Sequence, residues 1–284
     1  MLLTKPEMAA SEATTGIYPV LKWNDGHIED RNDCVAEEVP VAMVYNGISH
    51  AVMLATPQDL ADFALGFSLS EGILSSPEEL YDVEIVPQEK GIELHMQVAA
   101  ERFQHLKERR RSMSGRTGCG LCGSESLEQA MRIPESLNSA KVVNIADRIQ
   151  SQSIYLAQQN IYKQQQLQTL TGATHASAWV RPDGSIAMLR EDVGRHNALD
   201  KLIGARAYQR DTQAGFVLTT SRASYEMVQK VASAGISMLV AISAPTGLAI
   251  RIARDCGVTL VGFARNNQHV VYSRPDRILH KELA

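Results

Sequence analysis

The 284-residue chain has no apolar run that approaches the roughly 18 residues of a membrane-spanning helix. Its first 16 residues also lack the apolar stretch of a signal peptide. Aromatic residues make up only 5% of the chain, too few for platforms that stack single-stranded nucleic acid, and a net charge of −4 offers no general attraction to polyanions. We therefore expect a cytoplasmic protein that binds neither a membrane nor nucleic acid.

Cysteine is scarce as well, because four cysteines in a chain of this length do not make a disulfide scaffold. Cys34 and Cys256 are isolated, whereas Cys119 and Cys122 form a pair. Apolar residues at 44% and charged residues at 21% are an ordinary globular composition that can bury a sizeable core. The composition therefore predicts one or two domains with reduced thiols.

The hydrophobic pattern predicts an α/β protein in three parts. Residues 1–16 are expected to form a mobile tail, residues 17–140 a smaller N-terminal α+β part, and residues 141–284 a C-terminal α/β domain that binds a nucleotide or cofactor. In the N-terminal part, Asn46-Gly47 separates two β-rich runs, which is a strong signal for a type I′ hairpin turn. The following Thr56-Pro57 predicts the start of a helix.

Alternating strand and helix patterns predict a mostly parallel sheet in the C-terminal domain. Short apolar runs typical of buried strands lie at residues 216–219, 238–242 and 258–263. Helical spacing occupies the two intervals between them. Because ligands bind beyond the carboxyl ends of such strands, we expect a site where three segments converge, namely residues 220–222, 243–246 and 264–267.

The chemically richest feature is Cys119-Gly120-Leu121-Cys122, inside a glycine- and serine-rich loop at residues 112–123. Two thiols at this spacing can bind zinc, form a disulfide or pass sulfur between them. Zinc needs about four ligands, and no second ligand pair at short spacing accompanies this one, so zinc is not favoured. An accidental cysteine pair on a surface loop is the remaining alternative.

Basic residues precede the cysteine pair, with Lys107, Arg109, Arg110, Arg111 and Arg116 opposed only by a single glutamate. A guanidinium about 6 Å from a sulfur contributes roughly 0.7 kcal/mol at a dielectric constant of ~80 and roughly 2.8 kcal/mol at ~20. One well-placed arginine thus lowers a thiol pKa by about half a unit to two units, which favours the reactive thiolate. The alternative is a solvated helix face without a role in reactivity.

Several segments together carry a family likeness, and the most specific of them reads EDVGRHNALDK at residues 191–201. A second, GRTGCGLCG at residues 115–123, contains the cysteine pair. The remaining segments lie at residues 171–175, 221–228, 243–246 and 262–265, and all six segments occur along the chain in the expected order. Over about residues 37–272, the chain resembles the family of the formate dehydrogenase accessory sulfurtransferase FdhD.

The resemblance implies a sulfurtransferase that takes sulfur from a cysteine desulfurase and delivers it to the molybdenum cofactor destined for formate dehydrogenase. In the family the first cysteine of the pair carries the persulfide, which maps onto Cys119, with Cys122 as its companion. The resemblance also implies a cytidine-deaminase-like fold for the C-terminal domain and a homodimer. The zinc-deaminase signature is absent, since Gly118 stands where proline would precede the first cysteine, so deamination does not follow from this fold.

The family binds the guanine dinucleotide form of the molybdenum cofactor, so GDP or GMP would act as a mimic. The contributing segment follows the last core strand and maps onto Phe263, Ala264, Arg265, Asn266, Asn267 and Gln268. Family members often carry a glycine in this segment, whereas this chain carries none there. Neither the residues nor the resemblance places a resident metal site in this chain.

Residue chemistry adds Arg222, Thr246 and His196 to the candidates for this cofactor site, and it indicates what Arg265 contacts. Arg222 and Arg265 suit bidentate phosphate contacts, and Thr246 begins a helix whose positive dipole end attracts phosphate. The alternatives are arginines in surface ion pairs and a threonine that only caps its helix. His196 is either a proton donor near the transfer site or a histidine satisfied in the core, and His175 has the same two interpretations.

A second class of function stays open from the residues alone. It is a nucleotide-binding chaperone module in which the cysteine pair is structural or binds zinc.

Overall fold

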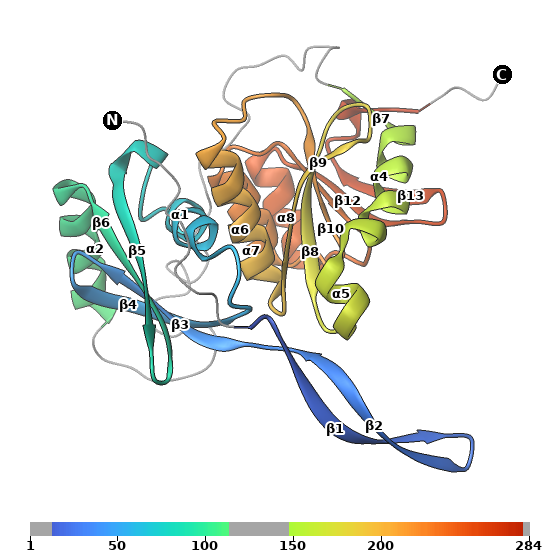
Figure 1. Cartoon of the computed structure of the whole chain (residues 1–284). Coiled ribbons are helices and arrows are strands. Elements are labelled where there is room, and N and C mark those ends of the chain that lie inside the picture. Colours follow the sequence, from blue (N-terminus) through green and yellow to red (C-terminus); the bar gives the residue numbers. More distant parts are fainter. Residues whose placement is uncertain (1–12, 114–147, 281–284) are drawn as a thin grey trace.

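The computed structural model describes residues 13–113 and 148–280. Cys119, Cys122 and all but the first two residues of the predicted 112–123 loop lie outside the described residues. The described part contains a four-stranded sheet, a six-stranded sheet with helices on both faces, and a long hairpin that projects from the body (Figure 1).

The four-stranded sheet comes from the N-terminal part of the chain. Its strands are β3 (Val39–Tyr45), β4 (Ile48–Ala55), β5 (Leu80–Gln88) and β6 (Gly91–Val98), in the order β4-β3-β6-β5. The predicted turn is confirmed, because Asn46 and Gly47 both have positive φ angles, 45° and 81°, and join β3 to β4. Three helical elements accompany the sheet: α1 (Leu60–Ser70), η1 (Pro77–Glu79) and α2 (Ala100–Met113).

The predicted helix start at Thr56-Pro57 is wrong. Helix α1 begins at Leu60, and its N-cap residue is Asp59 in a left-handed conformation. Thr56 is fully buried, and its hydroxyl accepts a hydrogen bond from the amide of Val193, 137 residues away. A tertiary contact therefore uses the side chain that local sequence chemistry would assign to a cap.

The six-stranded sheet forms the centre of the C-terminal part. It has the order β13-β12-β11-β10-β8-β9. The strands are β8 (His175–Val180), β9 (Ile186–Asp192), β10 (Phe216–Thr219), β11 (Met238–Ala241), β12 (Thr259–Arg265) and β13 (Gln268–Ser273).

The prediction of a mostly parallel sheet is wrong. Only β10–β11 and β11–β12 pair in parallel, whereas β8–β9, β8–β10 and β12–β13 are antiparallel. The reason is that short turns join β8 to β9 and β12 to β13, and a short turn can connect only antiparallel neighbours. The three central parallel strands, β10, β11 and β12, still have their carboxyl ends together at one edge of the sheet, as expected.

Helices cover both faces of this sheet (Figure 1). Helices α6 (Arg195–Tyr208), α7 (Tyr225–Ser233) and α8 (Gly247–Cys256) bury one face against residues such as Val217 and Leu239. Helix α4 (Ser151–Gln164) buries the other against Leu218 and Val240, and the short α5 (Gln166–Thr171) follows it. The chain then closes with η3 (Pro275–Arg277) and with β14 (Ile278–Leu279), which pairs with β7 (Ile149–Gln150).

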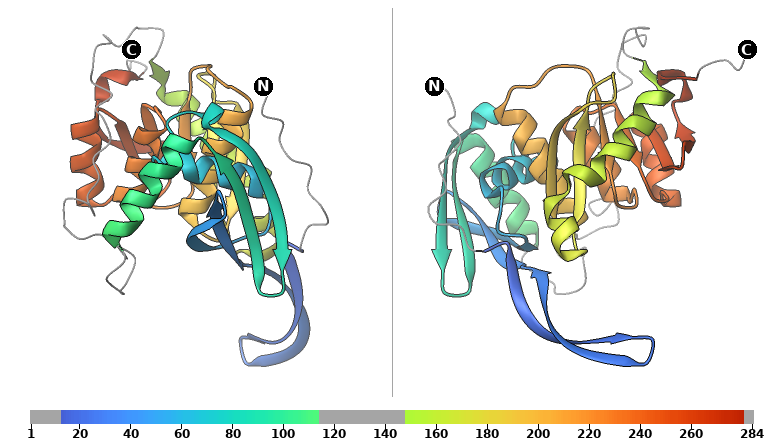
Figure 2. Two further views of the ribbon diagram at one scale, coloured as in Figure 1. Left: turned by 90° about the vertical axis from the view of Figure 1, so that its left-hand side faces the viewer. Right: turned by 45° about the vertical axis from the view of Figure 1, so that its right-hand side comes forward.

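An antiparallel hairpin of two ten-residue strands, β1 (Thr15–Asn24) and β2 (His27–Ala36), precedes the body. This hairpin was not predicted from the sequence, and β1 begins two residues inside the segment expected to be a tail. The available signal was Asp25-Gly26, a second type I′ dipeptide, and both residues have positive φ angles. The hairpin points away from both sheets in each view (Figures 1 and 2).

The two sheets are joined through a close crossing of α1 and α6. Gly66 of α1 faces the backbone of Asp200 and Gly204, and Gly204 of α6 faces the backbone of Asp62 and Gly66. A Cβ atom at either glycine would collide with a carbonyl oxygen of the opposite helix. Backbone therefore packs directly on backbone here, and only glycine fits at both positions.

We predict that Gly66→Ala or Gly204→Ala lowers the free energy of unfolding by about 3 kcal/mol or more, because a rigid backbone cannot yield to the new methyl group. Alanine is the better helix former, so intrinsic propensity acts in the opposite direction. Gly247→Ala is the matched control, since its Cβ would meet only the end of Arg251 at 3.8 Å. Urea unfolding should show the control within about 1 kcal/mol of the wild type. Equal stability of all variants would contradict the packing argument.

Candidate functional site

The EDVGRHNALDK segment folds around a fully buried ion pair between Asp192 and Lys201. Lys201 Nζ lies 2.6 Å from Asp192 Oδ2 and also donates to the carbonyl of Thr56 at 2.9 Å. Asp192 further accepts hydrogen bonds from the amides of Thr56 and Gly194 and from the Asn197 side chain, at 2.7–3.0 Å. Every oxygen of this buried carboxylate is thus paired, as a buried charge requires. The turn after β9 is consequently tied to the chain just before α1.

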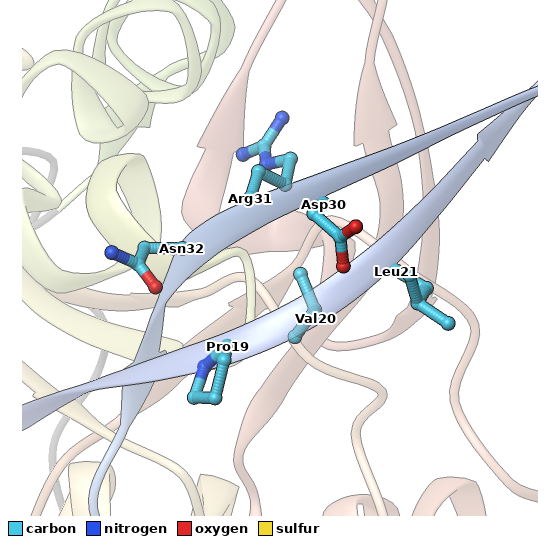
Figure 3. Close-up of a pocket in the computed structure, with 6 residues that line it drawn as sticks. All are labelled: Pro19, Val20, Leu21, Asp30, Arg31 and Asn32. Carbon is cyan, nitrogen blue, oxygen red and sulfur yellow. The ribbon is translucent and has the colours of Figure 1, made fainter.

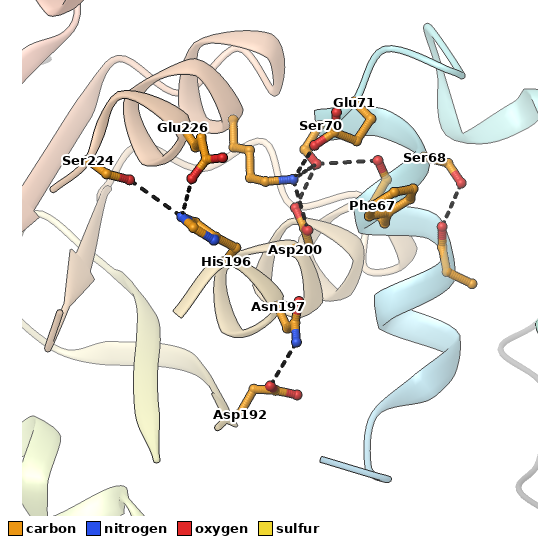
Figure 4. A network of polar contacts seen from close by, with 12 residues as sticks. Phe67, Ser68, Ser70, Glu71, Asp192, His196, Asn197, Asp200, Ser224 and Glu226 are labelled. Carbon is orange, nitrogen blue, oxygen red and sulfur yellow. Dashed lines mark hydrogen bonds and ion pairs between the residues drawn. The ribbon is translucent and has the colours of Figure 1, made fainter. Parts of the chain in front are cut away.

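A second buried cation, Lys230 of α7, completes the contact between the two parts of the chain. Its Nζ lies 3.0 Å from Asp200 of α6, 2.6 Å from Glu71 and 3.0 Å from Ser70, at the end of α1. Figure 4 labels these three partners. Burial acts to lower the pKa of Lys230, but the Asp200 and Glu71 carboxylates outweigh it and raise the pKa above its ordinary value. The lysine therefore stays charged.

His196 lies at the start of α6, where the turn reaches the surface. Its Nε2 is 2.8 Å from Glu226 Oε2 and 3.4 Å from Ser224 Oγ, both at the start of α7 (Figure 4). The side chain is 26% exposed, so the interpretation as a histidine satisfied in the core does not hold. The hydrogen bond from His196 holds the pKa of Glu226 below its ordinary value. The pair is thus an accessible donor and acceptor at the edge of the sheet.

His175 opens β8 and stands opposite Asp192 in the β8–β9 register. Burial lowers its pKa, and the nearby charges of Arg195 and His196 lower it further. We infer that the His175 imidazole is neutral at physiological pH. Two histidines of different character therefore lie at this edge: His175 is half-buried, and His196 is paired with a carboxylate.

Two of the three predicted strand-end segments converge at the same edge. Ala223 and Pro245 form a parallel β-bridge, and the amide of Thr246 donates to the carbonyl of Ala223 at 3.0 Å. Arg222 is exposed beside this bridge. The Thr246 hydroxyl caps α8 by accepting from the Ala249 amide at 3.2 Å, so its side chain is occupied as a cap and only its helix start can face a ligand.

The third segment, Phe263 to Gln268, is not the loop that was expected. Strand β12 continues to Arg265, and a tight turn at Asn266 and Asn267, with φ angles of 53° and 56°, leads directly into β13 at Gln268. Asparagine tolerates this left-handed conformation, so two asparagines make a turn that needs no glycine.

Only the beginning of the third segment reaches the other two. The amide of Phe263 donates to the Ser243 carbonyl at 3.1 Å, and Ala264 is buried in the core. Arg265 is exposed, with its guanidinium 5.8 Å from the Phe263 ring centre. Asn267 instead accepts a hydrogen bond from Gln159 of α4 at 3.4 Å. Asn266, Asn267 and Gln268 thus belong to the outer hairpin.

The described cysteines, Cys34 and Cys256, are not joined in a disulfide. Among the side chains that the structure describes, no group of three or more His, Cys, Asp or Glu could hold a metal ion. Within residues 13–113 and 148–280, no helix is long and apolar enough to cross a membrane.

Sequence reasoning missed the roles of Lys201, Asp200 and Lys230. Leu199, Leu202 and Ile203 recur at helical spacing and form one buried face of α6, and the charged residues between them were the available signal. Charges inside a buried face must be paired. Apart from Asp192, which is nine residues from Lys201, the partners lie 30 to 160 residues away and cannot be identified from one sequence.

The fold and the carboxyl ends of its central strands define a class of protein. It is a mixed α/β protein in which two histidines and the exposed arginines lie where the parallel strands end. The same fold occurs in the crystal structure of a formate dehydrogenase accessory protein from Desulfotalea psychrophila, with a TM-score of 0.70, 23% identity and coverage of 94% of this chain and 100% of that one.

Sequence comparisons identify the family. The model of the FdhD/NarQ family matches residues 36–279. Sulfur carrier protein FdhD of Cupriavidus necator is 54% identical over 96% of this chain and 93% of its own length. The protein of the same name from Bordetella petrii is 51% identical over 87% of each chain. The chain belongs to the FdhD/NarQ family, which confirms the resemblance seen in its motifs.

We predict that Arg195→Gln raises the pKa of His175 but leaves it below the ordinary imidazole value, because burial is the larger cause of the shift. The experiment is an NMR titration of the histidine imidazoles, with the His175 signal assigned from a His175→Gln variant. Arg181→Gln, which removes an arginine paired with Asp211, is the control and should leave the titration unchanged.

The lowered pKa of His175 also makes the stability of the fold depend on pH. As the pH falls through the ordinary imidazole pKa, the unfolded chain binds a proton before the folded chain does, so His175 makes the fold less stable in acid. A His175 titration at or above the ordinary value in the wild type would contradict the described surroundings.

Proposed function

We propose that this chain is a sulfur carrier in formate dehydrogenase maturation, which accepts sulfur from a cysteine desulfurase and transfers it to the molybdenum cofactor. The observation that carries the proposal is family membership over nearly the whole chain, with close relatives that bear the name of sulfur carrier. The polar edge of the six-stranded sheet supports it, because it offers exposed cations where a large anionic cargo can bind.

Cys119 is the proposed carrier residue, and Cys122 is its companion. The Cys119 thiolate attacks the terminal sulfur of the desulfurase persulfide, the donor's sulfur–sulfur bond breaks, and the donor cysteine leaves as a thiolate. The sulfur remains on Cys119 as a persulfide. The basic residues that precede the pair in the sequence favour the thiolate form of the attacking sulfur.

The cargo is the guanine dinucleotide form of the molybdenum cofactor, and we place its phosphates at the carboxyl ends of β10 and β12. Arg222 and Arg265 are exposed at these ends and can each offer a bidentate contact to phosphate. The start of α8 at Thr246 adds the positive end of a helix dipole between them. Phe263 forms the adjoining wall, Ala264 supports it from the core, and Asn266, Asn267 and Gln268 form its outer turn.

His196 and His175 supply proton chemistry at this edge. His196 Nε2 is held by two contacts from α7, to Glu226 and Ser224, so this imidazole is oriented to donate a proton. The neutral His175 can accept one. Two imidazoles in different surroundings are suited to a transfer in which the outer sulfur leaves Cys119 and the Cys119 thiolate takes up a proton.

Further parts of the proposal concern fold relationship, location and partners. The β8–β9 hairpin followed by the parallel strands β10, β11 and β12 supports a cytidine-deaminase-like C-terminal domain. We place the protein in the cytoplasm, with a cysteine desulfurase, formate dehydrogenase and a second copy of the chain as partners.

We predict that GDP binds at this edge and that Arg222→Ala or Arg265→Ala weakens binding by about 1.5–3 kcal/mol, or about 10- to 150-fold, through loss of a charge-assisted contact. Isothermal titration calorimetry measures this directly. Arg210→Ala is the matched control, because Arg210 is also exposed and contacts Glu78 at 3.9 Å, away from the strand ends. Wild-type affinity in both edge variants would remove the two arginines from the site.

A further inference from the structure

The β1–β2 hairpin, here called the arm, carries most of its exposed large apolar side chains on one face, which Asp30 and Asn32 share. In its register Ile17 pairs with Cys34, Leu21 with Asp30, and Trp23 with Ile28, and side chains of directly paired residues share a face. Ile17, Leu21, Trp23 and Ile28 are 66–70% exposed. The opposite face carries the charged residues Lys22, Glu29, Arg31 and Asp33. The arm is therefore amphipathic, with its apolar side uncovered.

The middle of the arm is also concave. Residues of both strands line a groove of about 340 Å³ there, namely Pro19, Val20, Leu21, Asp30, Arg31 and Asn32 (Figure 3). The chain's own body contacts the arm near its base, where α5 approaches β2. The distal half stands clear of both sheets in every view (Figures 1 and 2).

An amphipathic two-stranded ribbon of this kind needs a covering surface. Isolated hairpins are at best marginally stable in water, because they have no second layer on which to bury their apolar side chains. The four exposed large apolar side chains also lie in one stripe, whereas exposed apolar residues on an ordinary protein surface are scattered singly. The arm is thus built to pack on something other than its own body.

We propose that the arm packs on a second copy of this chain, in a reciprocal exchange around a two-fold axis. This inference deepens the second-copy partnership named in the proposed function and rests on it only for that partner. The docking surface is the outer face of the partner's four-stranded sheet, around Val52 and Leu54.

The area of the arm favours a reciprocal contact. Ten residues in each strand make a ribbon about 33 Å long and about 10 Å wide, so one face covers about 330 Å². A single arm on a partner would bury about 660 Å² in total, which is the size of a crystal contact. Two arms exchanged between two copies bury about 1,300 Å², which lies within the range of specific, stable interfaces. Only the two-fold arrangement therefore reaches the size that a stable complex requires.

The docking surface lies beside the root of the arm. Strand β3 follows the arm directly and pairs with β4, an edge strand of the four-stranded sheet. Val52 and Leu54 of β4 are 61% and 57% exposed and point to the same side of this sheet. Because each docking surface adjoins the root of its own arm, a two-fold axis between the roots lets both arms cross at once.

The test is the mass of the full chain in solution by sedimentation equilibrium. We expect two chains for the wild type, one for Trp23→Glu and one for Leu54→Glu. Tyr81→Glu is the matched control, because Tyr81 is also an aromatic residue on a strand and is 65% exposed, but it lies on β5 at the opposite edge of the sheet. It should keep the two-chain mass. Thermal unfolding establishes that each variant is folded.

A second measurement uses the wild type alone. The chain has two tryptophans, and Trp179 is 3% exposed under the guanidinium of Arg206. In the two-chain form acrylamide should quench neither, and on dilution to single chains it should quench Trp23. A single-chain wild type, or a Trp23→Glu protein that keeps the two-chain mass, overturns the proposal. A two-chain Leu54→Glu protein overturns the docking surface.

These outcomes are separable from the sulfur carrier function. A single-chain Trp23→Glu protein that still acquires sulfur on Cys119 supports both the arm exchange and the carrier role. A two-chain wild type that never acquires sulfur would remove the carrier role and leave the arm exchange in place.

Discussion

The direct contact between the backbones of α1 and α6 is the constraint on which the rest of this structure depends. Gly66 and Gly204 let the two helices touch, and this closeness brings the buried cations Lys201 and Lys230 within reach of carboxylates and carbonyls from both parts of the chain. Removing one partner of such a buried pair costs about 3–5 kcal/mol, because the other charge is left without compensation. The N-terminal and C-terminal sheets are therefore held as one unit by polar contacts that only close helix packing permits.

The same contacts position the candidate site. Asp192 fixes the turn at its centre, so the residues after it begin α6 in a set direction and present His196 to Glu226 of α7. One face of the EDVGRHNALDK segment thus joins the two sheets, while its first helical turn reaches the edge where the parallel strands end. This double use explains how a single short segment can be so specific to its family: some of its side chains are needed for folding and others for the site.

Local signals in the sequence predicted those elements that local chemistry determines. The Asn46-Gly47 turn and the three central strands are confirmed. Strand order alone predicted that residues 220–222 and 243–246 converge, and the observed bridge joins Ala223, the next residue, to Pro245. The failures share a physical cause, which is contact between distant residues. Thr56 serves Val193 instead of a helix cap, and antiparallel hairpins at both edges altered the sheet. Three further partners of Lys201 and Lys230, namely Thr56, Ser70 and Glu71, lie in the other part of the chain, so no local pattern could identify them.

Cys119 is the residue proposed to carry sulfur, and intact-mass spectrometry tests this assignment most directly. After incubation with a cysteine desulfurase and cysteine, the wild type should gain the mass of one sulfur atom, and a reductant should remove it. Cys122→Ala should still gain this mass, whereas Cys119→Ala should not. A reducible gain in Cys119→Ala together with its loss in Cys122→Ala would reverse the assignment. No gain in the wild type, with zinc bound instead, would contradict the sulfur carrier function.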